Sequence, residues 1–516
     1  MSVVIRPYRF MKGIRMKIEN LPLTNLFVVL LSGLLCGLFA SILPAMSFLL
    51  IIPFIALIYS EKPARLKMYS WGVFWYFGTI WWMAIVNLQG LQPLIFFATI
   101  GLSLFLALRF LLVGVLSAFV LKRCPKVAIL FIPSVWVVSE YVLTLGELSF
   151  PWMFSGYSLS PLFYLSQVVS ITGIWGLSFL AVISAVVLYN LVFFKRGKKI
   201  AVSLACVVAM LCLWGFVRVR PVDTHEIKAI VLQPNADMEN WYGFSSLMEC
   251  MEVLDSLLDA STNMDRGIFI LPESAIFTHL RYQPSALVAV GSWLRRHNSH
   301  IIFGSLTPIR GEGGVDGAYN TAYWASPELS NLYDNYARYH KIKLVPFVET
   351  TPFSAALPMI SRLDLRGGSF VSGSEYSVWE IEDLRIAPFI CYENVYPEFT
   401  RRRVNHGAGA NLMINITNDG WFGRTTAPIQ HAEMTRVRAI ELGISMVRSA
   451  NTGISFSVDP FGRFLAKTEI YTREVVQMPI AKALNSTIYR RFGDWFAIFC
   501  VLFSLFWLVY PSIRKK

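Results

Sequence analysis

Long apolar runs separated by short polar segments fill the first 220 residues of the chain, and one more lies near the C-terminus. A helix of about 20 apolar residues is long enough to cross a membrane. Most of these runs reach or approach that length; they cover residues 24–44, 68–88, 93–120, 127–145, 173–194, 199–217 and 494–511, and a shorter one covers 46–59. The pattern predicts a polytopic α-helical membrane domain with about eight spans.

Between residues 221 and 487 the pattern changes to short apolar or β-branched runs that alternate with helical periodicity. The runs typical of strands lie at 227–233, 267–271, 300–305, 333–339, 384–390, 411–417 and 454–459. Apolar residues at three- and four-residue spacing predict helices at 245–260, 284–296, 395–406 and 428–442. This alternation favours a layered α/β domain. We therefore expect a membrane domain at 1–220 with about seven spans, an α/β domain at 221–487, and a last span with a tail at 488–516.

Composition and charge support this division. With 55% hydrophobic residues, 15% charged residues and a mean hydropathy of +0.52, the chain is too apolar for an ordinary soluble protein. Its net charge of +13 could suggest a nucleic-acid partner, but the Lys and Arg excess lies in segments that flank the spans. These segments are 6–17, 62–67, 122–126, 195–199 and 514–516. The excess is therefore a topology signal, and no nucleic-acid partner is expected.

The positive-inside rule gives the orientation. Because the basic segments fall on every second side, both termini are expected in the cytoplasm and the α/β domain outside it. The basic N-terminus with the first span is interpreted as an uncleaved signal anchor, since further spans follow at once. Cys250 and Cys391 then lie in an oxidising compartment, where a disulfide is the ordinary expectation. The neighbours of Cys391 favour a free nucleophile instead.

Three candidate catalytic residues stand where predicted strands end, which is where open α/β sheets place their ligands. Glu273 follows the run at 267–271, Lys341 follows an aromatic run, and Cys391 directly follows the run at 384–390. A cysteine attacks as the thiolate and needs a base or a cation to form it. Glu273 could take the proton, and Lys341 could stabilise the thiolate and a tetrahedral oxyanion. His340 and His431 are the alternative bases.

Several short motifs carry a resemblance to known families. They are 271–274 (LPES), 341–349 (KIKLVPFVE), 391–393 (CYE), 418–423 (NDGWFG), 430–431 (QH), 448–453 (RSANTG), 150–152 (FPW), 156–157 (GY) and 173–176 (GIWG). The α/β segment resembles the nitrilase, or carbon-nitrogen hydrolase, superfamily, and nearly the whole chain resembles the apolipoprotein N-acyltransferase family. Leu271 stands where the family often has Trp, and Val348, Thr350 and Thr351 replace the more usual surroundings of Glu349. These departures concern the shape of the lid loop and leave the three candidate residues intact.

The resemblance implies an αββα nitrilase-like sandwich on the outer face of a bacterial inner membrane, with no metal or organic cofactor. Cys391 would attack the sn-1 ester of a phospholipid, commonly phosphatidylethanolamine. The resulting thioester would pass its acyl chain to the amine of the diacylglyceryl-cysteine of an apolipoprotein. Glu273 is then the general base, Lys341 the oxyanion stabiliser and Cys391 the nucleophile.

The resemblance also implies supporting residues. Glu349 and Glu393 would orient Lys341 and the thioester step, although each could be ordinary surface charge. Trp241, Tyr392 and Trp421 match positions that line the acyl or substrate pocket, although aromatic residues are often simply core.

Other interpretations stay open at this point. A membrane-bound nitrilase-type amidase would use the same three residues on a small amide, although a tether needs only one helix. A transporter with an accessory domain is a further alternative, but paired intramembrane charges in matched halves do not stand out. Arg109 and Glu140 lie inside predicted spans, where charge is costly, so they are functional candidates, or they snorkel or pair with each other across helices. Residues 352–370 form either a mobile arm facing the bilayer or a loop packed on the domain.

Overall fold

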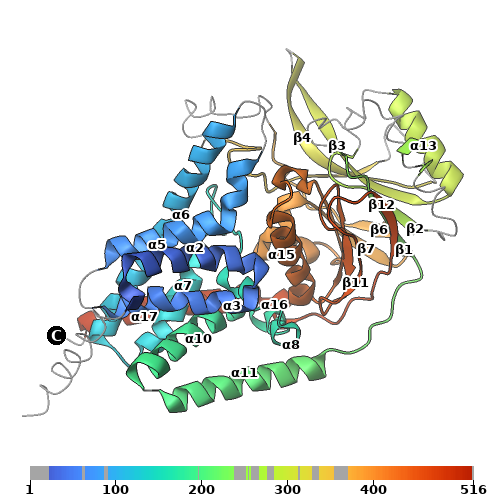
Figure 1. Ribbon diagram of the computed structural model, residues 1–516. Helices are drawn as coiled ribbons and strands as arrows, with labels where there is room; N and C mark the ends of the chain where they lie inside the picture. Colours follow the sequence, from blue (N-terminus) through green and yellow to red (C-terminus); the bar gives the residue numbers. More distant parts are fainter. Residues whose placement is uncertain are drawn as a thin grey trace, which may run out of the picture.

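The computed structural model describes residues 22–60, 64–86, 91–195, 197–236, 252–253, 255–256, 267–275, 284–311, 314–327, 336–353 and 370–513. In this part of the chain a bundle of helices lies beside an α/β domain, and the C-terminal helix returns to the bundle (Figure 1). The helices of the bundle are α2 (Leu26–Ile42), α3 (Pro44–Ser47), α4 (Ile52–Tyr59), α5 (Arg65–Ile80), α6 (Gln92–Arg123), α7 (Ala128–Val142), α8 (Phe163–Ser166), α9 (Val169–Thr172), α10 (Ile174–Phe194), α11 (Lys198–Arg218) and α17 (Trp495–Ile513).

Three helices, α6, α10 and α11, are long and apolar enough to cross a membrane by length and composition. Shorter apolar helices lie at 26–40, 48–59, 128–142, 163–172 and 495–510. The apolar side chains of α11, such as Met210 and Leu213, are mostly exposed, which suits a helix whose solvent is lipid. Several apolar helices are thus confirmed, whereas the count of about eight spans and their orientation stay predictions.

A buried polar cluster joins α6 and α7 inside the bundle. The Arg109 guanidinium lies 3.9 Å from Glu140 Oε1, donates to Tyr76 Oη at 2.6 Å and packs 4.0 Å from the Phe110 ring. Glu140 Oε1 also accepts from the backbone N–H of Ser155 at 2.8 Å. Among the interpretations of these charges, the structure therefore contains the pairing, and Glu140 also ties the loop after α7 into the bundle.

The α/β domain contains two six-stranded sheets. The first has the order β12-β1-β2-β3-β4-β5 and the second the order β11-β10-β9-β8-β7-β6. The strands of the first sheet are β1 (Lys228–Gln233), β2 (Gly267–Ile270), β3 (His300–Gly311), β4 (Gly314–Ala325), β5 (Ala337–His340) and β12 (Glu474–Met478). Those of the second are β6 (Trp379–Ile381), β7 (Leu384–Ile390), β8 (Leu412–Thr417), β9 (Ser445–Ala450), β10 (Phe456–Val458) and β11 (Phe464–Lys467). The parallel neighbours β1, β2 and β3, and likewise β7, β8 and β9, form the sheet centres.

The burial pattern explains the layering. Side chains alternate across a strand, so Val231, Ile268 and Ile270 of one sheet meet Ile390 and Ile414 of the other in a shared core. The opposite face of the first sheet packs on helix α13 (Pro284–His297) through Trp293. Helices α14 (Pro397–Val404) and α15 (Ala427–Leu442) cover the second sheet. The predicted αββα sandwich is confirmed, while most of the predicted helix at 245–260 lies outside the described residues.

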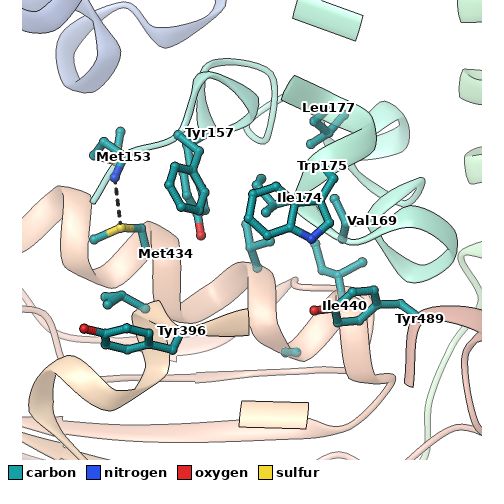
Figure 2. Packing of buried hydrophobic residues seen from close by; sticks show 14 of the residues in the cluster. Met153, Tyr157, Val169, Ile174, Trp175, Leu177, Tyr396, Met434, Ile440 and Tyr489 are labelled. Atoms are coloured by element: carbon teal, nitrogen blue, oxygen red, sulfur yellow. Dashed lines mark hydrogen bonds between the residues drawn. The ribbon is translucent and has the colours of Figure 1, made fainter. Parts of the chain in front are cut away.

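Helix α15 is packed on the sheet on one side and on the helical bundle on the other. Figure 2 shows Met153, Tyr157 and Trp175 of the bundle facing Met434 and Ile440 of α15 across a continuous apolar layer. Polar contacts cross the same boundary: Ile174 N–H donates to Glu441 Oε1 at 2.8 Å, and Met153 N–H contacts Met434 Sδ at 3.4 Å. The α/β domain is therefore seated directly on the helices.

Candidate active site

The three predicted catalytic residues meet at the ends of strands that lie in different sheets. Lys341 follows β5, Glu273 comes shortly after β2, and Cys391 begins the turn after β7. Lys341 Nζ lies 3.5 Å from Glu273 Oε1, and both side chains are buried. The Cys391 thiol is within electrostatic range of both charges. The structure thus brings together residues that are far apart in the sequence, as the strand-end pattern predicts.

The resting state of Cys391 is the thiol. Burial, together with the Glu273 carboxylate, raises its pKa to about 12, while Lys341 and a hydrogen bond with the Thr417 side chain act in the opposite direction. A thiolate must therefore form during attack, with its proton leaving to a neighbouring base. Cys391 is also a free cysteine; Cys250 lies outside the described residues.

Lys341 is held as a cation by two carboxylates. Burial alone would lower its pKa, but the Glu349 and Glu273 carboxylates outweigh this and raise the pKa above its ordinary value. Glu349 Oε1 is 2.9 Å from Lys341 Nζ, and Glu349 Oε2 accepts from Val345 N–H at 2.9 Å. Glu349 is itself buried, which excludes the interpretation that it is surface charge. A permanently charged lysine at this place can stabilise a developing oxyanion.

Glu273 is fixed by amide donors on both oxygens. Asn320 of β4 donates to Oε1 at 2.7 Å, and the backbone N–H of Asn418 donates to Oε2 at 3.0 Å. The turn after Glu273 passes so close to β3 that a Cβ at Gly304 would lie 2.5 Å from Ser274 N. Only glycine fits there without a backbone shift. Sequence reasoning missed Asn320, since it lies in a polar hairpin strand with no preceding apolar run.

The backbone of Cys391 has a left-handed conformation, with φ at 50°, which is strained for a residue with a side chain. Glu393, fully buried, braces this turn: its Oε2 accepts from Ile390 N–H at 2.9 Å, and its Oε1 accepts from Ile342 N–H at 2.8 Å and from Tyr339 Oη at 2.5 Å. Glu393 therefore joins the segment after β5 to the end of β7. As for Glu349, the surface-charge interpretation is wrong.

A second buried network supports the Cys391 carbonyl. Asn415 Nδ2 donates to Cys391 O at 3.2 Å, and Arg448 donates to Asn415 Oδ1 at 2.8 Å and to Asp419 Oδ2 at 2.7 Å. Asp419 Oδ1 lies 3.0 Å from His431 Nδ1. Asp419 is buried, but Arg448 and His431 still hold the pKa of its carboxyl at about 2.

The two alternative histidine bases each contact a neighbouring polar side chain. His431 pairs with Asp419, and burial together with Arg448 lowers the pKa of its imidazole. His340 Nδ1 lies 2.9 Å from Thr321 Oγ1 and its ring stacks on Tyr319 at 4.2 Å. Burial lowers the pKa of His340 to about 4, so it is a weak proton acceptor. This favours Glu273 as the acid and base.

The aromatic surroundings of Cys391 come partly from the helical bundle. Tyr392, next to Cys391, stacks on Trp152 with ring centroids 6.2 Å apart, and Trp152 Nε1 donates to Gln430 Oε1 at 2.6 Å. The ring of Phe422 packs against those of Trp152 and Trp82, with centroids 5.9 and 4.8 Å apart, respectively. Trp421 is half-buried nearby in sequence, and Trp241 lies outside the described residues.

The described residues contain no cluster of three His, Cys, Asp or Glu side chains that could hold a metal ion. Residues 354–369 of the predicted arm lie outside the described part. At its beginning, Phe353 N–H donates to Glu147 Oε2 at 2.5 Å, and the side chains of Phe347 and Phe353 are exposed. The start of the arm is thus joined to the loop that carries Trp152.

Comparison with known proteins finds two family domains. Residues 23–187 match the apolipoprotein N-acyltransferase N-terminal domain, and residues 229–489 match the carbon-nitrogen hydrolase domain. The apolipoprotein N-acyltransferase of Geobacter metallireducens is 30% identical over 504 residues, which cover 94% of each chain. That of Bradyrhizobium diazoefficiens is 30% identical over 440 residues, covering 81% of this chain and 80% of the relative. A solved amidase from Nesterenkonia sp. is 16% identical, with a TM-score of 0.36, and covers 50% of this chain and 92% of its own. The chain therefore belongs to the apolipoprotein N-acyltransferase family.

Proposed function

We propose that the protein transfers an acyl chain from the sn-1 position of a membrane phospholipid to the N-terminal amine of the diacylglyceryl-cysteine of apolipoproteins, through a thioester on Cys391. Phosphatidylethanolamine is the proposed donor. The observation that carries the proposal is the contact of Lys341 Nζ with Glu273 Oε1, at 3.5 Å, beside a free cysteine on a domain seated on apolar helices. Family membership supports the substrates.

In the first half-reaction, Glu273 takes the thiol proton as Cys391 Sγ bonds to the ester carbonyl carbon. The carbonyl oxygen becomes an oxyanion, and Lys341 stabilises it by its charge. Collapse breaks the bond to the glycerol oxygen, which receives the proton from Glu273 and leaves as the lysophospholipid. The acyl chain remains on sulfur as a thioester.

In the second half-reaction, the uncharged amine of the apolipoprotein attacks the thioester carbonyl. Glu273 accepts a proton from the attacking nitrogen, and Lys341 again stabilises the oxyanion. The carbon–sulfur bond breaks, the thiolate takes the proton back from Glu273, and the amide product leaves. Glu349 keeps Lys341 charged and in place, and Glu393 fixes the turn that presents the thiol; both are positioning residues. The reaction follows a ping-pong order.

We further propose that the α/β domain faces the periplasm of a bacterial inner membrane and that both termini are cytoplasmic. The basic segments on alternate sides of the apolar runs support this orientation. Because the α/β domain packs on the apolar helices, its site opens where both lipids and lipid-modified proteins are present. A cysteine-accessibility assay in intact cells and inverted vesicles tests the orientation.

The direct test is incubation of the purified protein with phosphatidylethanolamine and intact-mass spectrometry. We expect an acyl adduct on Cys391 that hydroxylamine removes, and conversion of a diacylated lipopeptide to a triacylated one after its addition. Cys391→Ala is the control. A nitrilase-type amidase uses the same three residues, but the stacking of Trp152 on Tyr392 gives the bundle a part in the site that a tether would not need. Hydrolysis of small amides without any lipid adduct would favour that alternative.

A further inference from the structure

A second lysine lies close to the catalytic lysine. Lys343 follows Lys341 by two residues, and its backbone N–H donates to Glu393 Oε1 at 3.2 Å. Glu393 belongs to the Cys391 turn, so the backbone of Lys343 is fixed relative to the nucleophile. The Lys343 ammonium group lies 5.2 Å from the Tyr396 ring centroid and 5.9 Å from that of Phe399. Its side chain is half-buried.

The surroundings place this ammonium group at the boundary with the helical bundle. Tyr396 Oη lies 3.0 Å from Ser149 Oγ in the loop after α7. Figure 2 shows Tyr396 on the catalytic-domain side of the layer that faces the bundle. Tyr141, at the end of apolar helix α7, is within electrostatic range of Arg402 and Glu398. The end of an apolar helix is where lipid headgroups lie.

Glu393, which acts on Lys343, and Glu398, which pairs with its neighbour Arg402, are both engaged elsewhere. Glu398 Oε2 pairs with Arg401 at 2.7 Å, and Glu398 Oε1 pairs with Arg402 at 2.8 Å. Glu393 accepts backbone N–H groups with both oxygens and lies 4.0 Å from Arg403. In the described ranges of the chain, neither carboxylate forms an ion pair with Lys343. One anion is therefore shared by two arginines, and a third cation is left beside them.

The electrostatics of Lys343 agree with such an excess of positive charge. Burial lowers the pKa of its ammonium group and the neighbouring Arg402 lowers it further, while Glu393 acts in the opposite direction. A cation crowded by burial and by another cation gains stability when an anion comes between them. A phosphate group carries such a charge, and lysine binds it as a point charge.

We propose that Lys343, assisted by Arg402, binds the phosphate group of the acyl donor, so that the donor is recognised by its headgroup phosphodiester as well as by its ester. This inference rests on the proposed function. The acceptor amine carries no phosphate at its reacting end, so the subsite acts on acyl loading and not on aminolysis. The subsite lies beside the Cys391 turn, so it holds the headgroup at the boundary with the helical bundle while the ester enters the active site.

The test compares two donors with the same acyl chains, one with a phosphoethanolamine headgroup and one with a free hydroxyl in its place. The rate of thioester formation on Cys391 is measured by intact-mass spectrometry with phosphatidylethanolamine and, separately, with a diacylglycerol of the same acyl chains. We expect Lys343→Gln to reduce the ratio of the two rates about tenfold, the loss typical of one charge-assisted contact. Lys343→Arg should keep most of the ratio. Lys467→Gln is the control, because Lys467 also has its ammonium group 5.9 Å from a ring centroid, that of Phe464 on β11, although it is more exposed to solvent.

The outcomes separate the inference from the proposed function. An equal fall with both donors would mean that Lys343 only packs on Tyr396, or pairs with a carboxylate of the chain, and would overturn the subsite. An unchanged ratio would overturn it as well. Glycerophosphoethanolamine should slow loading of the unsubstituted protein. If inorganic phosphate slows loading equally well, the subsite binds a free anion and not specifically the lipid headgroup, which would overturn the inference. If the unsubstituted protein forms no thioester with either donor, the proposed acyl transfer itself fails, and the subsite with it.

Discussion

Trp152 of the helical bundle stacks on Tyr392 of the α/β domain, with ring centroids 6.2 Å apart and ring planes 16° from parallel. Tyr392 follows Cys391 directly, so both domains contribute side chains to the surroundings of this cysteine. Since the stack lies between a loop tied to α7 and the Cys391 turn, a change in the bundle can reach Cys391 without touching Glu273 or Lys341.

Trp152→Ala should therefore destabilise the protein and slow acyl loading together. Loss of a buried tryptophan typically costs about 3 to 5 kcal/mol in the free energy of unfolding. Trp152→Phe keeps an aromatic ring but loses the hydrogen bond to Gln430, so its cost should be about 1 kcal/mol. Thermal unfolding in detergent measures the first effect, and the rate of thioester formation the second. A Trp152→Ala protein with unchanged melting and loading would contradict this contribution of the bundle.

Glu273→Gln should make Cys391 more reactive to a simple alkylating agent while strongly slowing acyl transfer. The Glu273 carboxylate contributes to the raised pKa of the thiol, so its removal increases the thiolate fraction at pH 8, and alkylation by iodoacetamide about tenfold. Acyl transfer needs the proton acceptor and should fall by about 10² to 10⁴. Lys341→Met should do the opposite to alkylation, because Lys341 lowers the thiol pKa. Slower alkylation of Glu273→Gln would exclude this electrostatic arrangement.

Asn320→Ala should slow thioester formation by about tenfold to a hundredfold, because Glu273 loses its donor at 2.7 Å and is free to leave its productive position. Single-turnover loading followed by mass spectrometry measures the effect. Iodoacetamide alkylation of Cys391 serves as the internal control, since Asn320 contacts the carboxylates and not the thiol. A matching fall in alkylation would show a disturbed fold instead of a misplaced base.

Much of this arrangement is predictable from the sequence, and the failures have a physical cause. Glu273 and Cys391 follow buried parallel strands, whose apolar runs are visible without a structure. Asn320 is not, since β4 begins in a glycine-rich polar hairpin, and the position of its side chain beside Glu273 depends on the pairing of β4 with β3. Of the predicted strand at 333–339, residues 333–335 lie outside the described part of the chain, and Ala337–His340 form β5, an edge strand with a weak apolar pattern.

The contact of Trp152 with the Cys391 turn is also not predictable from the sequence, for a different reason. Its hydrogen-bond partner Gln430 is 278 residues away in the sequence. Local periodicity reports which face of an element is buried, but not which domain covers it. The motif at 150–152 is recognisable in the sequence. Its contact with the Cys391 turn is not, because that contact depends on the packing of α15 between the sheet and the bundle.

The same packing predicts a pH dependence of stability at Glu441. Glu441 of α15 is fully buried at the start of α10, accepts from Ile174 N–H at 2.8 Å and lies 3.1 Å from Arg438 Nε. Burial raises the pKa of its carboxyl from 4.5 to about 7, although Arg438 acts against the shift. A raised carboxyl pKa means that the folded protein binds a proton more tightly than the unfolded chain. The contribution is present below pH 4.5 and is lost as the pH rises through 7.

Glu441→Gln removes this titration while keeping the shape of the side chain. The variant resembles the protonated carboxyl, so its stability should lie close to that of the unsubstituted protein at pH 5, and it should become the more stable of the two as the pH rises to 8. The difference in free energy of unfolding between the two proteins should change by at most about 3 kcal/mol over this range, because the variant no longer has the proton linkage of Glu441. Thermal unfolding of both proteins over this range measures the difference, and Glu433→Gln, which changes a less buried carboxylate on the same helix, is the control. A disadvantage that grows with pH would mean that Glu441 is ionised throughout and that its pairing with Arg438 outweighs burial.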